Sequence, residues 1–180
     1  MRLALTPSGE RRAEYIRRKN IFHSMGENCL IMKRKIPLYP ELISIGNNVR
    51  IASNVSFITH DITHEVLNHM NLDSEVVFPE KIGCISIGNN VFIGAGTRIL
   101  YDTKIGSQVI IATGSIITHD IPDNTVVAGV PARKIGTFED YVTKRKKEAF
   151  QNSELGSIGL KNKIIENVWN EFYEKRLENN

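Results

Sequence analysis

The chain has 180 residues, 41% of them hydrophobic and 24% charged, and its formal net charge is +3. This composition is ordinary for a folded globular domain, and so mild a charge argues against a nucleic-acid partner. The apolar runs are far shorter than a membrane span or the core of a signal peptide, so we expect no stable membrane insertion. The two cysteines, Cys29 and Cys84, form no disulfide framework and no metal-ligand spacing, and they suit a reducing cytoplasm.

Residues 1–24 predict an N-terminal helical segment. In the stretch TPSGERRAEYIRRKN, Thr6 is the expected N-cap and Pro7 the first helical residue.

Residues 25–135 are dominated by a period of six. From Ile87 the chain reads IGNNVF, IGAGTR, ILYDTK, IGSQVI, IATGSI and ITHDIP, with isoleucine at every first position and mostly glycine or alanine at the second. The same period occurs earlier as IGNNVR, IASNVS and FITHDI, beginning at Ile45, and residues 26–42 predict an imperfect first coil. A period of six matches neither an α-helix nor simple strand alternation.

This period predicts an all-β solenoid of short strands joined by tight corners. The first position of each hexad points inward and stacks on the next, the small second position allows close backbone approach, and polar pairs occupy the corners. Three hexads close one triangular coil, and adjacent coils pair through parallel ladders.

The period is interrupted from Asp61 to Ser86, in a polar stretch that contains His64 and His69. A solenoid tolerates an insertion at a corner because the coil resumes on the next rung, and such insertions often carry binding. We therefore expect a projecting loop over 61–86, with His60 at the point where the rigid coils meet it.

Residues 136–180 predict a C-terminal helical extension. The basic stretch YVTKRKKEAF begins a helix or a linker, and apolar residues then recur at helical spacing. These residues are Leu160, Ile164, Ile165, Val168, Trp169, Phe172, Tyr173 and Leu177. We expect this apolar stripe to pack against the body of the protein or against a neighbouring subunit.

The hexads, the interruption after ITHD and the stretch GSIITHDIPDNTVVAGVPARKI together resemble the hexapeptide-repeat acyltransferases, in the branch of galactoside, maltose and xenobiotic O-acetyltransferases. The resemblance covers about residues 26–135 and implies a left-handed parallel β-helix, an exception to the right-handed crossover rule. It also implies a homotrimer with active sites between subunits, acetyl-CoA as the acyl donor and a small-molecule or glycan acceptor.

In this family the catalytic base is a histidine at the end of a coil, before the projecting loop. His60 occupies that position, with His64 as the alternative. A hydroxyl is too weak an acid to ionise at neutral pH, and an imidazole can take its proton and return it to the departing thiolate. Asp61, Glu65 or a backbone carbonyl would orient the ring. Neither cysteine lies beside a histidine, which predicts direct transfer without an acyl-enzyme.

The resemblance also implies residues that bind the acyl donor. Small side chains let the pantetheine arm lie against the backbone, and fixed positive charge meets the phosphates. These positions are Phe92, Gly94, Ala95, Ala112, Thr113, Thr118, Arg133 and Lys134. The small residues also suit tight corners of the fold, and the two cations also suit a solvated basic end.

Two other functions fit the same scaffold. One is a metal-dependent hydratase similar to γ-class carbonic anhydrases, although His60, His64 and His69 crowd one edge instead of matching faces of separate coils. The other is a non-catalytic β-helix that only binds partners. We expect acetyl transfer to a hydroxyl of a sugar, glycan or xenobiotic, and no metal site.

Overall fold

A computed structural model describes residues 6, 8–70, 75–151 and 162–177. It divides into two compact units, Met1–Tyr141 and Val142–Asn180, which we describe separately. Among the described helices, none is long and apolar enough to cross a membrane.

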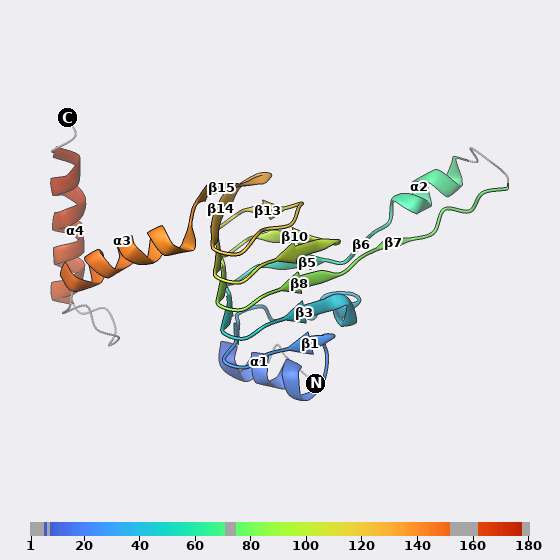
Figure 1. The fold of residues 1–180 in the computed structure, drawn as a ribbon, viewed down its shortest axis with the longest axis horizontal. Coiled ribbons are helices and arrows are strands. Elements are labelled where there is room, and N and C mark those ends of the chain that lie inside the picture. The colour runs from blue at the N-terminus through green and yellow to red at the C-terminus, as the bar shows by residue number, and fades with distance from the viewer. Residues whose placement is uncertain (1–5, 7, 71–74, 152–161, 178–180) are drawn as a thin grey trace. The chain divides into compact units, whose positions relative to one another are not determined.

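Three sheets with parallel strands form the body of the first unit, and the chain visits them in cyclic order (Figure 1). The first sheet contains β1 (Ser24–Met25), β3 (Ile43–Ile45), β8 (Ile85–Ile87) and β11 (Thr103–Ile105). The second contains β2 (Leu30–Ile31), β4 (Val49–Ile51), β9 (Val91–Ile93), β12 (Val109–Ile111), β14 (Thr125–Gly129) and the antiparallel β15 (Ala132–Gly136). The third contains β5 (Ser56–Ile58), β10 (Arg98–Leu100) and β13 (Ile116–Ile117).

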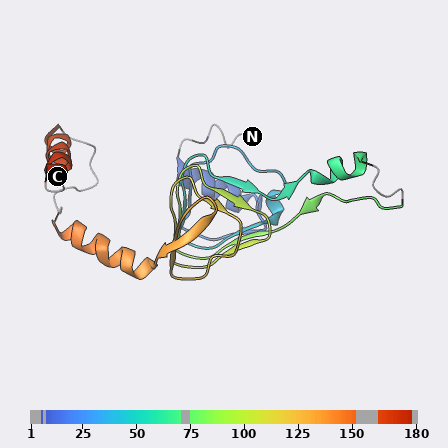
Figure 2. The ribbon, with the colours of Figure 1, turned by 90° about the horizontal axis from the view of Figure 1, so that it is seen from above.

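The strand register confirms that three hexads make one coil. Ile85 pairs with Thr103 and Val91 pairs with Val109, so neighbouring coils are 18 residues apart in sequence. Seen from above, the coils lie over one another (Figure 2). The second, fourth and fifth coils therefore share one repeating geometry, and the offset changes only where the chain leaves the repeat.

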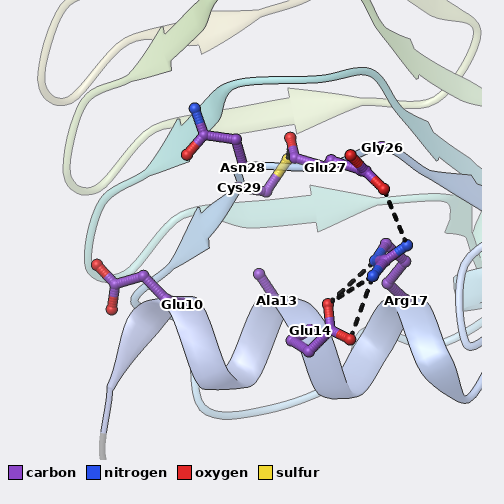
Figure 3. Close-up of a pocket in the computed structure, with 8 residues that line it drawn as sticks. All are labelled: Glu10, Ala13, Glu14, Arg17, Gly26, Glu27, Asn28 and Cys29. Atoms are coloured by element: carbon purple, nitrogen blue, oxygen red, sulfur yellow. Dashed lines mark hydrogen bonds and ion pairs between the residues drawn. The ribbon is translucent and has the colours of Figure 1, made fainter.

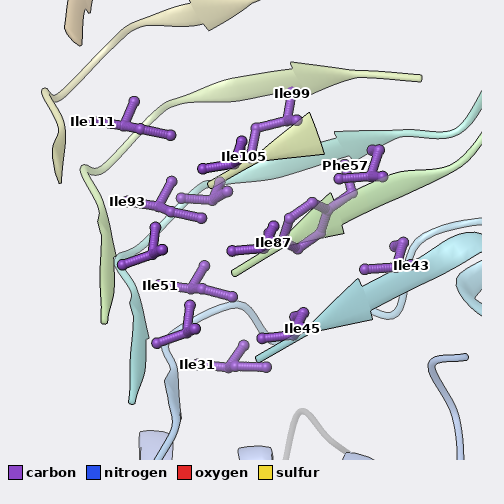
Figure 4. Packing of buried hydrophobic residues seen from close by; sticks show 14 of the residues in the cluster. Ile31, Ile43, Ile45, Ile51, Phe57, Ile87, Ile93, Ile99, Ile105 and Ile111 are labelled. Atoms are coloured by element: carbon purple, nitrogen blue, oxygen red, sulfur yellow. The ribbon is translucent and has the colours of Figure 1, made fainter. Parts of the chain in front are cut away.

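The inward column of isoleucines is the core of this unit. The six first-position residues from Ile87 to Ile117 are at most 3% exposed, as the hexads predicted, and they stack along the coils (Figure 4). Each fully buried isoleucine contributes about 1.5–3 kcal/mol relative to an exposed one. The repeated first position is thus the main apolar contribution to the stability of the coils.

The second and third positions of the hexads set the spacing of the coils. A Cβ added to Gly88 would lie 2.7 Å from the carbonyl carbon of Gly106 on the next coil. At the corner, the backbone N–H of Asn47 donates to Asn89 Oδ1 at 2.7 Å, and the N–H of Asn89 donates to Ser107 Oγ at 3.0 Å. The corners are therefore joined by a polar ladder that runs along the coils.

Helix α1 (Gly9–Arg18) covers the N-terminal end of the core with Ala13 and Ile16. The prediction of Thr6 as its N-cap is wrong. Ser8 is the N-cap, because its backbone is extended and its Oγ accepts a hydrogen bond from Arg11 N at 3.2 Å. The Thr6 carbonyl instead accepts from Arg12 Nη1 at 2.7 Å, and Pro7 lies outside the described residues.

The interruption of the repeat is an arm, defined here as residues 60–82, which projects from the coils (Figures 1 and 2). Strands β6 (His60–Asp61) and β7 (Lys81–Ile82) pair antiparallel at its base, and β6 leads into helix α2 (Thr63–His69). Pairing across the arm rises from 18 to 42 residues, as between Ile45 and Ile87, so the arm adds 24 residues to one coil.

The C-terminal part contains two helices. Helix α3 (Phe138–Gln151) is capped by Thr137, whose Oγ1 accepts a hydrogen bond from Asp140 N at 3.1 Å. Helix α4 (Asn162–Leu177) belongs to the second unit and carries Trp169, whose ring stacks on Tyr173 at 5.7 Å. Leu160 lies outside the described residues, and the packing partner of the apolar stripe stays a prediction.

Candidate functional site

His60 stands where the regular coil ends. It follows β5 and the buried Thr59, and it opens β6 opposite Ile82. The hydroxyl of Thr59 donates to the Leu38 carbonyl at 2.7 Å, and its carbonyl accepts from Gly83 N at 2.9 Å. These bonds hold the backbone before His60 between the preceding coil and the returning strand of the arm.

The imidazole of His60 is half-buried and contacts the ring of Tyr39. The two ring centroids are 5.3 Å apart, and the planes are inclined by 80°. Nδ1 of His60 is buried, and among the described residues it has no hydrogen-bond partner. Neither Asp61 nor Glu65 therefore orients the ring through Nδ1, although the sequence analysis named both for that role.

Asp61 instead anchors the base of the arm. Its Oδ1 accepts from Thr63 N at 3.0 Å and from the Thr63 hydroxyl, and its Oδ2 accepts from the Tyr101 hydroxyl at 2.5 Å. The bonds from Thr63 and Tyr101 lower the pKa of the Asp61 carboxyl to about 2, and the bond to Asp61 raises the pKa of Tyr101. Asp61 is therefore a carboxylate at neutral pH, committed to holding the arm.

The other two histidines of the arm lie on α2. His64 Nε2 is 3.9 Å from Glu65 Oε1, and His69 Nδ1 is 2.6 Å from the Glu65 carbonyl oxygen. Across the described part of the chain, no three His, Cys, Asp or Glu side chains group in a way that could hold a metal ion. His60, His64 and His69 thus have separate surroundings.

The residues predicted to bind the acyl donor fall into two groups. The first lies at one corner of adjacent coils, where Gly94 N donates to the Ile111 carbonyl and Gly114 N donates to the Ala95 carbonyl. A Cβ on Gly94 would lie 2.4 Å from Thr113 N, so the packing of the coils by itself requires glycine there. Phe92, two residues before Gly94, is 44% exposed and presents an apolar ring beside this corner.

The second group lines a cavity of about 150 Å³ at the C-terminal end of the coils, between the segment after β13 and strand β15. Thr118, Arg133 and Lys134 all line it, as does His119, whose Nδ1 is 2.6 Å from Thr118 Oγ1. Two cations and two polar side chains from separate strands thus meet around one hollow. The structure brings these three predicted residues together.

A larger cavity, of about 400 Å³, lies between α1 and the turn at 26–29 (Figure 3). Arg17 donates to Glu14 at 3.0 Å and lies 3.6 Å from Glu27, so the main charges in this cavity pair with one another. No residue predicted from the sequence lines it.

The structure adds residues that the sequence analysis missed. Tyr39 contacts His60, Glu80 accepts a hydrogen bond from the Tyr39 hydroxyl at 2.9 Å, and Tyr101 holds Asp61. A signal for Tyr101 was available, because it puts an aromatic ring at the third position of ILYDTK, where the other hexads from Ile87 onward carry smaller residues. Tyr39 and Glu80 lie outside the regular hexads and gave no such signal.

Comparison with known proteins gives three kinds of match. The sequence model described as "Bacterial transferase hexapeptide (six repeats)" matches residues 84–119. Protein CapG of Staphylococcus aureus is 40% identical over 137 residues, which cover 73% of this chain and 76% of CapG. Galactoside O-acetyltransferase of Escherichia coli strain K12 is 43% identical over 100 residues, which cover 54% of this chain but 45% of that enzyme.

Among solved structures, a galactoside acetyltransferase in complex with coenzyme A is 31% identical, with a TM-score of 0.58. The match covers 78% of this chain and 76% of that one. The chain therefore spans from about half to three quarters of the length of these relatives.

Proposed function

Because this chain belongs to the hexapeptide-repeat acyltransferase family, we propose that it is an acetyl-CoA-dependent O-acetyltransferase in which His60 is the general base. Membership in the family implies the left-handed parallel β-helix, and the cyclic order of three parallel sheets agrees with such a coil. The observation that carries the proposal is the position of His60, an imidazole fixed at the end of a coil where the repeat gives way to the arm.

The proposed reaction is a direct transfer. A ring nitrogen of His60 accepts the proton of the acceptor hydroxyl while the oxygen attacks the thioester carbonyl carbon. The C–O bond forms, the C–S bond of the tetrahedral intermediate then breaks, and the imidazolium returns its proton to the thiolate. The products are an acetyl ester and coenzyme A with a free thiol. A positioned base of this kind accelerates such a step by about 10²–10⁴-fold.

The acyl donor is proposed to lie along the coils between the two groups of predicted residues. At one end, Arg133 and Lys134 supply fixed positive charge that suits phosphate groups, with Thr118 as a hydroxyl donor. At the other, Phe92 and the corner formed by Gly94, Ala95, Ala112 and Thr113 would receive the pantetheine part. The bound coenzyme A of the similar galactoside acetyltransferase supports this donor.

The acceptor is proposed to be a hydroxyl of a sugar, a glycan or a small xenobiotic. The support is the match to galactoside O-acetyltransferase, since the arm that would contact the acceptor lies outside the repeat. The coupled proposal of a homotrimer rests on apolar surface that a neighbouring subunit would cover: Ile62 and Val66 on the arm are 64% and 63% exposed. The two unpaired cysteines suit the cytoplasm, where we propose that it acts.

The test is release of thiol from acetyl-CoA across galactosides, glycan fragments, chloramphenicol and streptogramins. We expect one acceptor class to release thiol, and His60→Ala to lower kcat by about 10²–10⁴-fold at an unchanged melting temperature. His69→Ala is the matched control, since His69 caps its own helix through Glu65, and it should keep kcat within about twofold.

Three outcomes would contradict the proposal. Thiol release by His60→Ala at the wild-type rate would remove His60 as the base. The absence of thiol release with every acceptor would favour a partner-binding β-helix. Stoichiometric zinc in the purified protein, together with CO₂ hydration, would favour the carbonic-anhydrase-like alternative.

A further inference from the structure

We infer that Tyr39 is a positioning residue for the reaction, one that holds the imidazole of His60 in place through ring contact and not through a hydrogen bond. This inference rests on the proposed function of His60 as the base.

The first argument comes from what surrounds the imidazole. The ring of Tyr39 meets it nearly edge to face, at 5.3 Å between centroids and 80° between planes, within the favoured range for aromatic pairs. A catalytic histidine is commonly oriented by a hydrogen bond at its second nitrogen. Here Nδ1 is buried without a partner among the described residues, so Tyr39 is the contact that limits rotation of the ring.

The second argument comes from how Tyr39 is itself held. Its backbone is left-handed, with φ 49° and ψ 56°, directly before Pro40 and the short helix η2 (Pro40–Leu42). A tyrosine adopts this conformation at a cost, and it persists where surrounding contacts determine it. The Tyr39 hydroxyl donates to Glu80 Oε2 at 2.9 Å, and the bond raises the pKa of Tyr39.

The third argument is that the clasp joins the segments that enclose His60. Leu38, next to Tyr39, accepts the hydroxyl of Thr59, next to His60. Glu80 directly precedes β7, whose Ile82 pairs with His60. The segment before η2, the end of the coil and the returning strand of the arm therefore converge on one ring, although Tyr39 and Glu80 are 41 residues apart in sequence.

The activity test compares Tyr39→Leu, which removes the ring, with Tyr39→Phe, which keeps the ring and loses the bond to Glu80. We expect kcat to fall about ten- to a hundredfold in Tyr39→Leu, with KM for acetyl-CoA within about twofold of the wild type. Tyr39→Phe should retain most of kcat. Tyr101→Phe is the matched control, because it breaks a second tyrosine–carboxylate bond at the arm base, one made to Asp61.

A double variant separates positioning from general damage. If Tyr39 acts through His60, Tyr39→Leu should lower kcat no further in a protein that already carries His60→Ala. A loss that adds in full to that of His60→Ala, or wild-type kcat in Tyr39→Leu, would overturn the inference.

A structural measurement tests the inference apart from the activity. Side-chain NMR couplings of His60 should report one ring orientation in the wild type and in Tyr39→Phe, and averaged orientations in Tyr39→Leu. A single unchanged orientation in Tyr39→Leu would overturn the inference whether or not the protein transfers acetyl groups. If Tyr39→Leu does not fold, Glu80→Gln should increase the ring averaging, and failure to do so would count against the clasp.

Discussion

The coils and the arm use the same kinds of aliphatic side chain in opposite ways. Ile93 and Ile99 in the coils are fully buried, whereas Ile62 and Val66 in the arm are 64% and 63% exposed. The coils repeat one backbone geometry every 18 residues, and the arm has no repeat and is fixed at its base by polar contacts. In this molecule, regular sequence provides stability, and the candidate chemistry lies where regularity ends.

The largest effect should come from shortening a core residue. Ile93→Ala removes apolar volume from the closed column and is expected to lower the free energy of unfolding by about 2–5 kcal/mol. Val66→Ala on the arm should change it by less than about 0.5 kcal/mol. Denaturant titration of both variants measures the difference, and equal losses would contradict the contrast between coils and arm.

A glycine at the second position of a hexad should be the next most sensitive site. Gly88→Ala places a Cβ 2.7 Å from the backbone of Gly106, so neighbouring coils must separate, at a cost of about 1–3 kcal/mol. Gly136→Ala is the matched control, since a Cβ there meets no atom within 4 Å. Thermal melting of the two variants should differ, and the same melting temperature in both would show that the coils adjust freely.

The sequence alone predicted the coils well, because one inward residue in six suffices to specify the column from Ile87 to Ile117. It predicted less about the ends. Both Thr6 and Ser8 are good N-cap types, and only the backbone shows that Ser8 Oγ meets Arg11 N. In the arm, which has no periodic pattern, the sequence indicated a loop where the structure forms α2 and the β6–β7 pair.

The candidate site was predictable in part for the same reason. His60 stands at the visible break in the repeat, and Arg133 and Lys134 belong to a recognisable tail. The Tyr39–Glu80 clasp and the Tyr101–Asp61 bond join residues 41 and 40 positions apart. Such contacts depend on how far the arm returns before the next coil begins, which no local pattern encodes.

A smaller effect, on binding, should come from the basic cavity at the end of the coils. Arg133→Ala is expected to raise KM for acetyl-CoA by about ten- to a hundredfold, because bonds to charged groups are worth about 1.5–3 kcal/mol. The melting temperature and kcat should stay near those of the wild type. Lys144→Ala, on helix α3 outside the cavity, is the control. An unchanged KM in Arg133→Ala would place the phosphates elsewhere.

The smallest effect should be a change with pH at the base of the arm. The pKa of Asp61 is lowered to about 2 from an ordinary value of 3.8, so its bonds stabilise the fold above about pH 4 and are lost as the pH falls toward 2. Asp61→Asn should therefore melt slightly earlier than the wild type at pH 7, and the difference should vanish near pH 2. A difference independent of pH would show that the charge is not responsible.

The central claim is that His60 removes the proton of an acceptor hydroxyl placed beside the thioester. Its most direct test is a crystal structure of the protein with acetyl-CoA and an acceptor identified by thiol release. The account predicts an acceptor oxygen about 3 Å from a ring nitrogen of His60 and about 3–3.5 Å from the thioester carbonyl carbon. A thioester sulfur lodged where no oxygen bound to His60 could reach the carbonyl would contradict it.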